Sequence, residues 1–270
     1  MSRIASTFAA RRRQGRRALM PFLMGGDPSL DATDAFLMRF AESGADLLEI
    51  GVPFSDPIAD GPVNQRAAQR ALHAGVTLPA LLEMVAGMRN RVAQPIVLLT
   101  YYNPVYQIGL EAFCRRASAA GVDGVVIPDL PPEEGDPLRA AADQIGLDVI
   151  FLAAPTSTDG RLARVAASSR GFVYCVSLTG VTGVRADLAA DVGMLVDRLR
   201  RHTTLPICVG FGVSTPEHAR HVAEVADGVI VGSAIVAIIE REGAAAGPAL
   251  AAFVSSLRAG VDAAVGAPAP

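Results

Sequence analysis

The chain has 270 residues, 51% of them hydrophobic, and a formal net charge of −3. Its apolar residues form short runs, and none reaches the roughly 18 residues that a membrane span requires. Composition therefore argues against a membrane protein, and the slightly negative charge gives no general attraction to nucleic acid. All 24 cationic side chains are arginine. Without lysine, the chain cannot form a Schiff base with a carbonyl compound.

The three cysteines, Cys114, Cys175 and Cys208, are widely spaced and form no C-x-x-C pair. This spacing argues against a disulfide framework and a thiolate metal site, and it favours a reducing, cytoplasmic location. The arginine-rich segment 11–17 precedes the short stretch "ALMPFLM", which contains a proline and leads into no cleavage pattern. We interpret this segment as part of a solvated first helix rather than a targeting signal.

Apolar, β-branched runs alternate along the chain with longer segments of helical period, which predicts repeated βα units and a parallel sheet. The eight predicted strands are Leu19–Met24, Asp46–Ile50, Pro95–Leu99, Gly124–Ile127, Asp148–Leu152, Phe172–Val176, Pro206–Gly210 and Gly228–Val231. The predicted helices include Asp31–Ser43, Leu78–Arg91, Leu110–Ala120, Pro137–Ile145, Asp159–Ser168, Val192–Arg201 and Pro216–Glu224. We therefore predict one α/β domain over residues 1–270, a (β/α)8 TIM barrel with short additional helices and a disordered tail over about 262–270.

Three predicted strands begin alike, in "GADLLEIG", "GVDGVVIPD" and "VADGVIVGS", each with an aspartate just before the apolar run. Such a repeated unit is typical of a closed barrel. Barrels of this kind build their active sites from the loops at the C-terminal ends of the strands. The candidate functional residues are therefore those at strand ends and just beyond.

Glu49 lies near the end of the second predicted strand, where alternation puts it on the same side as Leu47 and opposite Leu48 and Ile50. If that side faces the barrel axis, the carboxylate points into the mouth of the barrel. Burial would then raise its pKa, so that it could exchange a proton near neutral pH. The alternative is a structural glutamate that accepts hydrogen bonds from nearby backbone or hydroxyl groups.

Two more acids follow in the loop "SDPIADGP", Asp56 and Asp60, and a third, Asp129, follows the fourth strand in "IPDLPPEE". The prolines and glycine of the first loop preclude regular structure but permit a shaped loop that closes over a site. Loop aspartates usually cap turns or helices, and Asp60 could cap a helix that begins near Pro62. Asp129 is interpreted as a loop-ordering or partner-facing residue.

The last three strand ends are rich in glycine, in "SLTGVTGV", "VGFGVS" and "VGSAIVAII". Gly183, Gly212 and Gly232 can bring backbone N–H groups close to an anion, and Ser233 would begin a short helix whose N-terminus favours negative charge. A phosphate site is expected at this place in the barrel. Ordinary turn glycines are the alternative, and the Rossmann fingerprint is a weak match because "GFGVST" lacks its third glycine.

Apolar residues near the strand ends could form a flat pocket between the acids and the phosphate site, although each could equally be barrel core. They are Phe22, Leu99, Val126, Leu152, Tyr174 and Phe211. The four histidines fall on predicted helices or before a strand, so no metal site is expected. The remaining chemistry is proton transfer by carboxylates on a phosphorylated substrate.

Seven motifs, in chain order, resemble the tryptophan synthase alpha subunit family: "PFLMGGDP", "LLEIGVPFSDPIADGP", "YYNPV", "PDLPPEE", "SLTGVTGVR", "GFGVS" and "GSAIV". The resemblance runs from about Phe8 to the last helix. It implies a carbon–carbon lyase of tryptophan biosynthesis that cleaves indole-3-glycerol phosphate to indole and glyceraldehyde 3-phosphate.

By this resemblance Glu49 is the general acid and base, and Asp60 stabilises positive charge on the indole nitrogen. Gly183, Gly212, Gly232 and Ser233 bind the phosphate, Tyr174 and Thr182 flank the site, and Phe22, Leu99 and Phe211 hold the indole.

The resemblance also implies a partner, a beta subunit that carries pyridoxal phosphate and receives the indole, in an alpha2-beta2 heterotetramer. The alpha chain itself then needs no cofactor. Mobile loops over Pro53–Asp60 and Leu178–Asp187 are implied, with Pro53, Asp56 and Asn103 near the contact and Asp129 and Thr182 beside it. Two rival hypotheses remain: a phosphosugar isomerase of the same fold, and an inactive barrel that binds a phosphorylated ligand and activates the partner.

Overall fold

The strands of the computed structural model form one parallel sheet. The structure describes residues 1–176, 185–210 and 212–264, and for residues 185–191 it describes the backbone alone. The strands are β1 Ala18–Met24, β2 Leu48–Gly51, β3 Ile96–Leu99, β4 Gly124–Val126, β5 Asp148–Ile150, β6 Leu152–Ala153, β7 Val173–Val176, β8 Ile207–Gly210 and β9 Gly228–Val231. Their order is β5-β4-β3-β2-β1-β9-β8-β7-β6. Only Phe151 separates the two edge strands, so the chain itself closes the ring. The predicted TIM barrel is confirmed.

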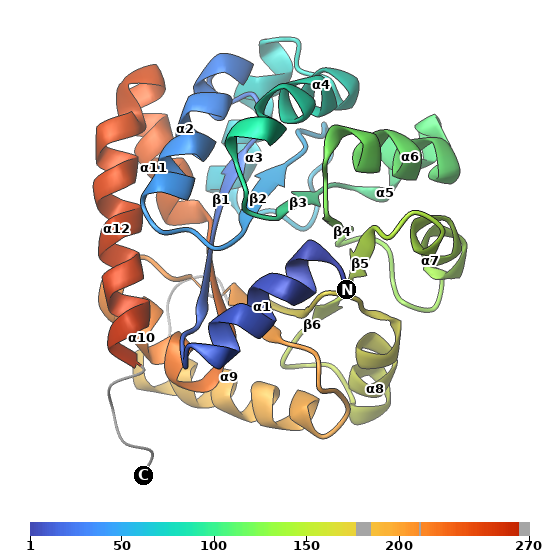
Figure 1. The fold of residues 1–270 in the computed structure, drawn as a ribbon, viewed down its shortest axis with the longest axis vertical. Helices are drawn as coiled ribbons and strands as arrows, with labels where there is room; N and C mark the ends of the chain where they lie inside the picture. Colours follow the sequence, from blue (N-terminus) through green and yellow to red (C-terminus); the bar gives the residue numbers. More distant parts are fainter. Residues whose placement is uncertain (177–184, 211, 265–270) are drawn as a thin grey trace.

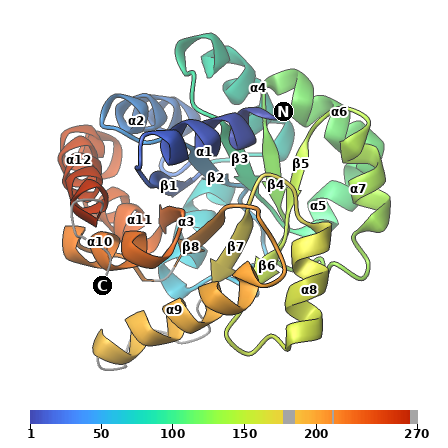
Figure 2. The ribbon, with the colours of Figure 1, turned by 60° about the horizontal axis from the view of Figure 1, so that its bottom comes forward.

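Helices surround the strands, which lie at the centre of the view in Figure 2. They are α1 Arg3–Arg13, α2 Leu30–Glu42, α3 Pro62–His73, α4 Leu78–Met88, α5 Tyr102–Ile108, α6 Leu110–Ala120, α7 Asp136–Asp143, α8 Asp159–Ser168, α9 Arg185–Arg200, α10 Pro216–Val225, α11 Ser233–Glu242 and α12 Gly247–Ala263. Two 3₁₀ turns, η1 Arg89–Arg91 and η2 Gly243–Ala246, follow α4 and α11.

The predicted elements differ from the observed ones in several places. The fifth strand is split, because β5 pairs with β4 and β6 pairs with β7. Helix α5 was not predicted: it has seven residues, holds a proline and stops at Gly109, where φ is +90°. Helix α9 begins at Arg185, ahead of the predicted start at Val192.

The tail is predicted to begin at about residue 262, and α12 continues to Ala263. Asp262 is held there by ion pairs with Arg16 and Arg258. Residues 265–270 lie outside the described part of the chain.

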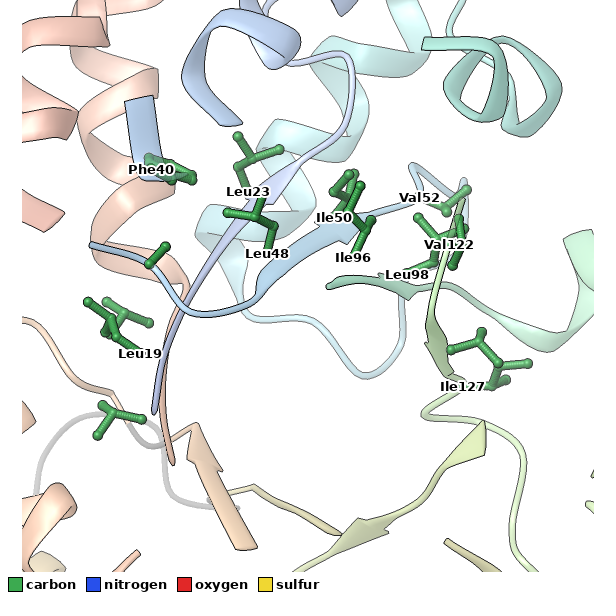
Figure 3. Close-up of a cluster of buried hydrophobic side chains, with 14 of the residues drawn as sticks. Leu19, Leu23, Phe40, Leu48, Ile50, Val52, Ile96, Leu98, Val122 and Ile127 are labelled. Atoms are coloured by element: carbon green, nitrogen blue, oxygen red, sulfur yellow. The ribbon is translucent and has the colours of Figure 1, made fainter. Parts of the chain in front are cut away.

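Apolar side chains form two layers, one on each side of the sheet wall. Leu48 and Ile50 of β2 belong to the outer layer between strands and helices, together with Leu23 and Leu98 (Figure 3). The inner layer fills the barrel and includes Leu47, Val97, Val126, Ile150, Phe172, Tyr174, Cys208 and Ile230. Cys208 lies in the inner layer and Cys175 in the outer, so both are core residues.

Helix α1 lies across one end of the barrel (Figure 1). Ile4 and Phe8 enter the inner layer, and the Phe8 ring lies 5.8 Å from that of Phe172. Arg11, near the end of the helix, forms an ion pair with the buried Asp46. Arg12 and Arg13 are exposed, as expected of a solvated first helix, but the apolar face of α1 also closes the bottom of the barrel.

The aspartates that precede three strands have a common function. The Leu19 amide donates to Asp46 Oδ2 over 2.9 Å, the Ile96 amide to Asp123 Oδ2 over 2.8 Å, and the Ile207 amide to Asp227 Oδ2 over 3.0 Å. In each case the donor is the first or second residue of the preceding strand. Each carboxylate also pairs with arginine: Arg11 and Arg258 at Asp46, Arg3 and Arg89 at Asp123, and Arg200 at Asp227. The repeated sequence pattern therefore fixes neighbouring strands at the closed end of the barrel.

One stretch of the described residues, Ser233–Ala263, is long and apolar enough by composition to cross a membrane. The chain divides it into α11, η2 and α12, with a break at Gly243, where φ is +58°. Helices α3 and α4 together would pass the same test only across a bend of 93°. Helices that pack around the core of a protein can have the same length and apolar composition.

Two helical glycines provide a test of packing between the outer helices. A Cβ at Gly260 of α12 would overlap the carbonyl oxygen of Pro216 and lie 2.8 Å from its carbonyl carbon, whereas a Cβ at Gly193 of α9 would meet nothing within 4 Å. We expect Gly260→Ala to lower the free energy of unfolding by about 2 kcal/mol, as overpacking does. The matched change Gly193→Ala should raise it by about 0.5–1 kcal/mol. Urea denaturation measures both, and equal effects would contradict this packing.

Candidate active site

Glu49 of β2 is fully buried at the mouth of the barrel. It pairs in register with Phe22 of β1 and Val97 of β3, and Leu47, two residues earlier, belongs to the inner layer. The predicted inward orientation of Glu49 is therefore confirmed. Neither carboxylate oxygen has a hydrogen-bond partner among the described residues. The alternative of a structural glutamate, satisfied by backbone or hydroxyl groups, finds no support there.

The environment of Glu49 favours its protonated form. Burial raises its pKa to about 8, the nearby Tyr174 hydroxyl opposes part of that rise, and the negative charge of Asp60 adds to it. The contact between the Tyr174 hydroxyl and Glu49 falls short of a well-formed hydrogen bond, but it is close enough to favour the ionised form of Glu49. A carboxylic acid with such a pKa can both give and take a proton near neutral pH.

Asp60 lies at the end of the loop between β2 and α3. The Tyr101 hydroxyl donates to its Oδ2 over 3.0 Å, and Gln65 Nε2 donates to its backbone oxygen over 2.8 Å. Burial raises the pKa of the Asp60 carboxyl, while Tyr101 and, to a lesser extent, Asn64 oppose the rise. The capping interpretation is wrong, because the N-cap of α3 is Gly61 and no side chain caps that helix.

Sequence reasoning missed Tyr101, which follows β3 and is 2% exposed. Its ring stacks on Phe54 with centroids 5.1 Å apart, and its hydroxyl accepts from the Ala59 amide over 3.0 Å. The only signal was its position just after a strand, within "YYNPV". Its contacts come from a different loop, which the sequence does not place beside it.

The apolar candidates divide between two clusters that meet at Leu99. Phe22 packs with Met24, Val63 and the alanines of α3, while Val126, Leu152 and Tyr174 belong to the inner layer; Leu99 packs against both clusters. The Phe22 ring has room because Gly51 and Gly232 carry no side chain. A Cβ would lie 2.8 Å from its Cζ at Gly51 and 3.2 Å from its Cδ1 at Gly232. Phe211 lies outside the described residues.

The glycines proposed to hold a phosphate are described in part. Gly212 has a φ of +54°, and a Cβ there would meet nothing within 4 Å among the described residues; Gly232 is the N-cap of α11 without a side-chain cap. Ser233 is exposed and begins that helix, so the first amides of α11 remain available to an anion. Gly183 and Thr182 lie outside the described residues.

The loop residues expected to face a partner differ in their exposure. Asp56 and Asn103 are exposed, whereas Pro53 is buried. Asp129 accepts from the Tyr102 amide over 2.9 Å, which orders the loop after β3 as expected. Ile58, at the tip of the β2–α3 loop, is 82% exposed.

A hollow of about 220 Å³ opens beside the mouth of the barrel. It is lined by Pro128, Asp129, Leu130, Pro131, Pro132, Phe151, Leu152 and Arg161. Among the described side chains, no three of the types His, Cys, Asp and Glu are grouped as metal ligands would be.

Comparison with known proteins gives one consistent result. The family model described as "Tryptophan synthase alpha chain" matches residues 8–263. The alpha chain of Geobacter sulfurreducens is 56% identical over 259 residues, which cover 96% of this chain and 98% of the relative. That of Roseiflexus castenholzii is 52% identical over 242 residues, covering 89% and 93%.

Solved structures agree with these sequences. Mycobacterium tuberculosis tryptophan synthase superposes with a TM-score of 0.89 at 41% identity, covering 97% of this chain and 98% of that chain. The alpha subunit from Legionella pneumophila gives a TM-score of 0.90 at 35% identity, with 97% and 99% covered. Since both the family model and these relatives span nearly its whole length, the chain belongs to the tryptophan synthase alpha chain family, whose members serve tryptophan biosynthesis.

Proposed function

We propose that this chain is a carbon–carbon lyase that cleaves indole-3-glycerol phosphate to indole and glyceraldehyde 3-phosphate. One observation carries the proposal: Glu49, a fully buried carboxyl group with no hydrogen-bond partner among the described residues and a pKa raised to about 8, lies at the mouth of the barrel. Membership of the alpha chain family supports the choice of substrate.

The reaction requires one proton to enter the substrate and one to leave it. Protonated Glu49 donates to C3 of the indole ring, which makes the ring an electron sink. The resulting carboxylate then takes the proton of the neighbouring side-chain hydroxyl. The bond between C3 and the carbinol carbon breaks, its electron pair restores the indole, and the carbinol becomes the aldehyde. Glu49 ends protonated, so a single group of raised pKa serves both steps.

Asp60 serves as the electrostatic partner of this transfer. Protonation at C3 places positive charge on the ring nitrogen, and an ionised carboxylate nearby stabilises that charge. Phe22 and Leu99, with Val126, Leu152, Tyr174 and Phe211, enclose the indole. The phosphate binds to the amides at Gly183, Gly212, Gly232 and Ser233, the last two at the N-terminus of α11.

The chain acts with a beta subunit in the cytoplasm, in an alpha2-beta2 assembly, and passes indole to it. Pyridoxal phosphate belongs to that partner, in keeping with the absence of lysine from this sequence. Pro53, Asp56, Asn103, Asp129 and Thr182 contribute to the partner-facing loops. The exposed Ile58 and Asn103 support a contact surface at this end of the barrel.

Release of indole from indole-3-glycerol phosphate tests the proposal directly. Purified chain is assayed with and without a beta subunit. Indole should form in both assays and faster in the second. An inactive barrel that only activates the partner would release none in either.

Glu49→Gln should lower indole release by about 10²–10⁴-fold, because the amide cannot donate or accept the transferred proton. Binding of a phosphate analogue without the reacting hydroxyl should change little, since Gln fills the same space. Glu83→Gln, an exposed change on α4, is the matched control and should leave the rate unchanged. Near-normal turnover by the Glu49 variant would defeat the assignment.

The same variant should change how stability depends on pH. The pKa of Glu49 rises from its ordinary value of 4.5 to about 8 in the fold, so between these values the folded chain holds a proton that the unfolded chain releases. Its contribution to stability is complete below about pH 4.5 and is lost as the pH rises through about 8. Between about pH 5 and 8 the free energy of unfolding of the unaltered chain should therefore fall by a few kcal/mol relative to that of Glu49→Gln, which has no group to titrate at this position. Parallel curves would show that Glu49 titrates normally.

Asp60→Asn should reduce kcat by roughly 10–100-fold while KM changes little, because the amide keeps the contact with Tyr101 but loses the negative charge. The loss should remain incomplete, since Glu49 still transfers the proton. Asp197→Asn, an exposed change on α9, is the control. Steady-state kinetics measure both variants, and an unchanged kcat would remove Asp60 from the mechanism.

A further inference from the structure

The β2–α3 loop contacts one buried side chain, Tyr101, near both of its ends. At the first end, the Phe54 ring stacks on the Tyr101 ring with an interplanar angle of 29°. At the second end, the Ala59 amide donates to the Tyr101 hydroxyl, and that hydroxyl donates to Asp60. Tyr101 lies two residues after another strand, β3, so the β2–α3 loop is held by a residue that follows a neighbouring strand of the barrel.

The direction of these hydrogen bonds is fixed by the chemistry of the groups. An amide N–H can only donate, so the Tyr101 oxygen accepts from Ala59. The phenol has one proton, and the 3.0 Å contact directs it to Asp60 Oδ2. Burial and the charge of Asp60 raise the pKa of Tyr101, so the hydroxyl keeps that proton. Accepting one bond while donating another strengthens both.

Between the two ends, the loop makes mostly local contacts. Ser55 Oγ donates to Asp56, the Ile58 amide donates to the Asp56 carbonyl, and the Asp60 amide donates to the Pro57 carbonyl. Ser55, Asp56 and Ile58 are exposed. Gln65 Nε2 donates to the backbone oxygen of Asp60. Two side chains act on the Asp60 carboxyl, Tyr101 and Asn64, and Tyr101 has the larger effect. The orientation of the carboxylate therefore depends mainly on Tyr101.

We propose that Tyr101 is a positioning residue of the reaction, which directs the Asp60 carboxylate toward the indole nitrogen and clamps both ends of the loop that carries it. A tyrosine needed only for packing would use its ring and not its hydroxyl. The kinetic consequence rests on the proposed lyase function. The structural consequence, slower amide hydrogen exchange in the β2–α3 loop, does not rest on that function.

Tyr101→Phe tests the hydroxyl while it keeps the ring and its stack on Phe54. We expect kcat for indole release to fall about tenfold, with KM little changed, because a hydrogen bond to a charged group is lost. Tyr106→Phe is the matched control, since its ring is 63% exposed on α5, and it should have the unaltered kcat. In an Asp60→Asn background, Tyr101→Phe should lower kcat much less than about tenfold, because both residues act through one carboxylate.

Amide hydrogen exchange provides a readout that does not depend on catalysis. In the free chain, exchange at Ala59 and in the peptide 54–61 should be faster in Tyr101→Phe and unchanged in Tyr106→Phe, while segments on the far side of the barrel stay the same. Unchanged exchange at Ala59 would overturn the proposal. So would an unchanged kcat in Tyr101→Phe, or an undiminished loss in the Asp60→Asn background. If the unaltered chain releases no indole, the lyase function has failed, and exchange alone then decides whether Tyr101 clamps the loop.

Discussion

The proposed activity depends on keeping one carboxyl group, which has no hydrogen-bond partner among the described residues, away from water. An isolated ionised carboxylate is too costly to bury, so Glu49 stays protonated, and that state makes it useful as an acid. The surrounding barrel must hold its shape without help from this residue. Two apolar layers and the aspartates at the bottom of the strands provide that support, at the end of the barrel opposite the chemistry.

The two acids of the site are held in different ways. Glu49 sits on a strand whose neighbours fix it on both sides, whereas Asp60 sits on a loop. A rigid acid suits a proton transfer, which needs one geometry at both steps. A loop acid can enter after the substrate, provided that something guides it to its place. Tyr101 is the group that the fold offers for this purpose.

The strands and the orientation of Glu49 could be predicted because buried parallel strands are apolar runs and side chains alternate along them. The aspartates before the strands were recognised as a repeat. Their hydrogen bonds to the preceding strands were not predicted, because they depend on how neighbouring strands align, and the sequence of one segment does not give that alignment. Tyr101 and the buried face of α1 were missed for a related reason. Each acquires its function from a partner distant in sequence: the loop that ends at Asp60 for Tyr101, and Phe172 for α1. The alternative that Asp60 caps α3 was wrong, because Gly61 is the N-cap residue of that helix.

The cations at the closed end of the barrel are all arginines, and this has a consequence for alkaline conditions. A guanidinium keeps its charge far above neutral pH, so the pairs of Asp46, Asp123 and Asp227 persist where an amine would begin to lose its proton. Mild alkali therefore deprotonates the acid at the open end while the ionic contacts at the other end remain intact. Loss of activity in mild alkali should therefore come from deprotonation of Glu49 and not from unfolding of the barrel, and it should reverse when the medium is neutralised.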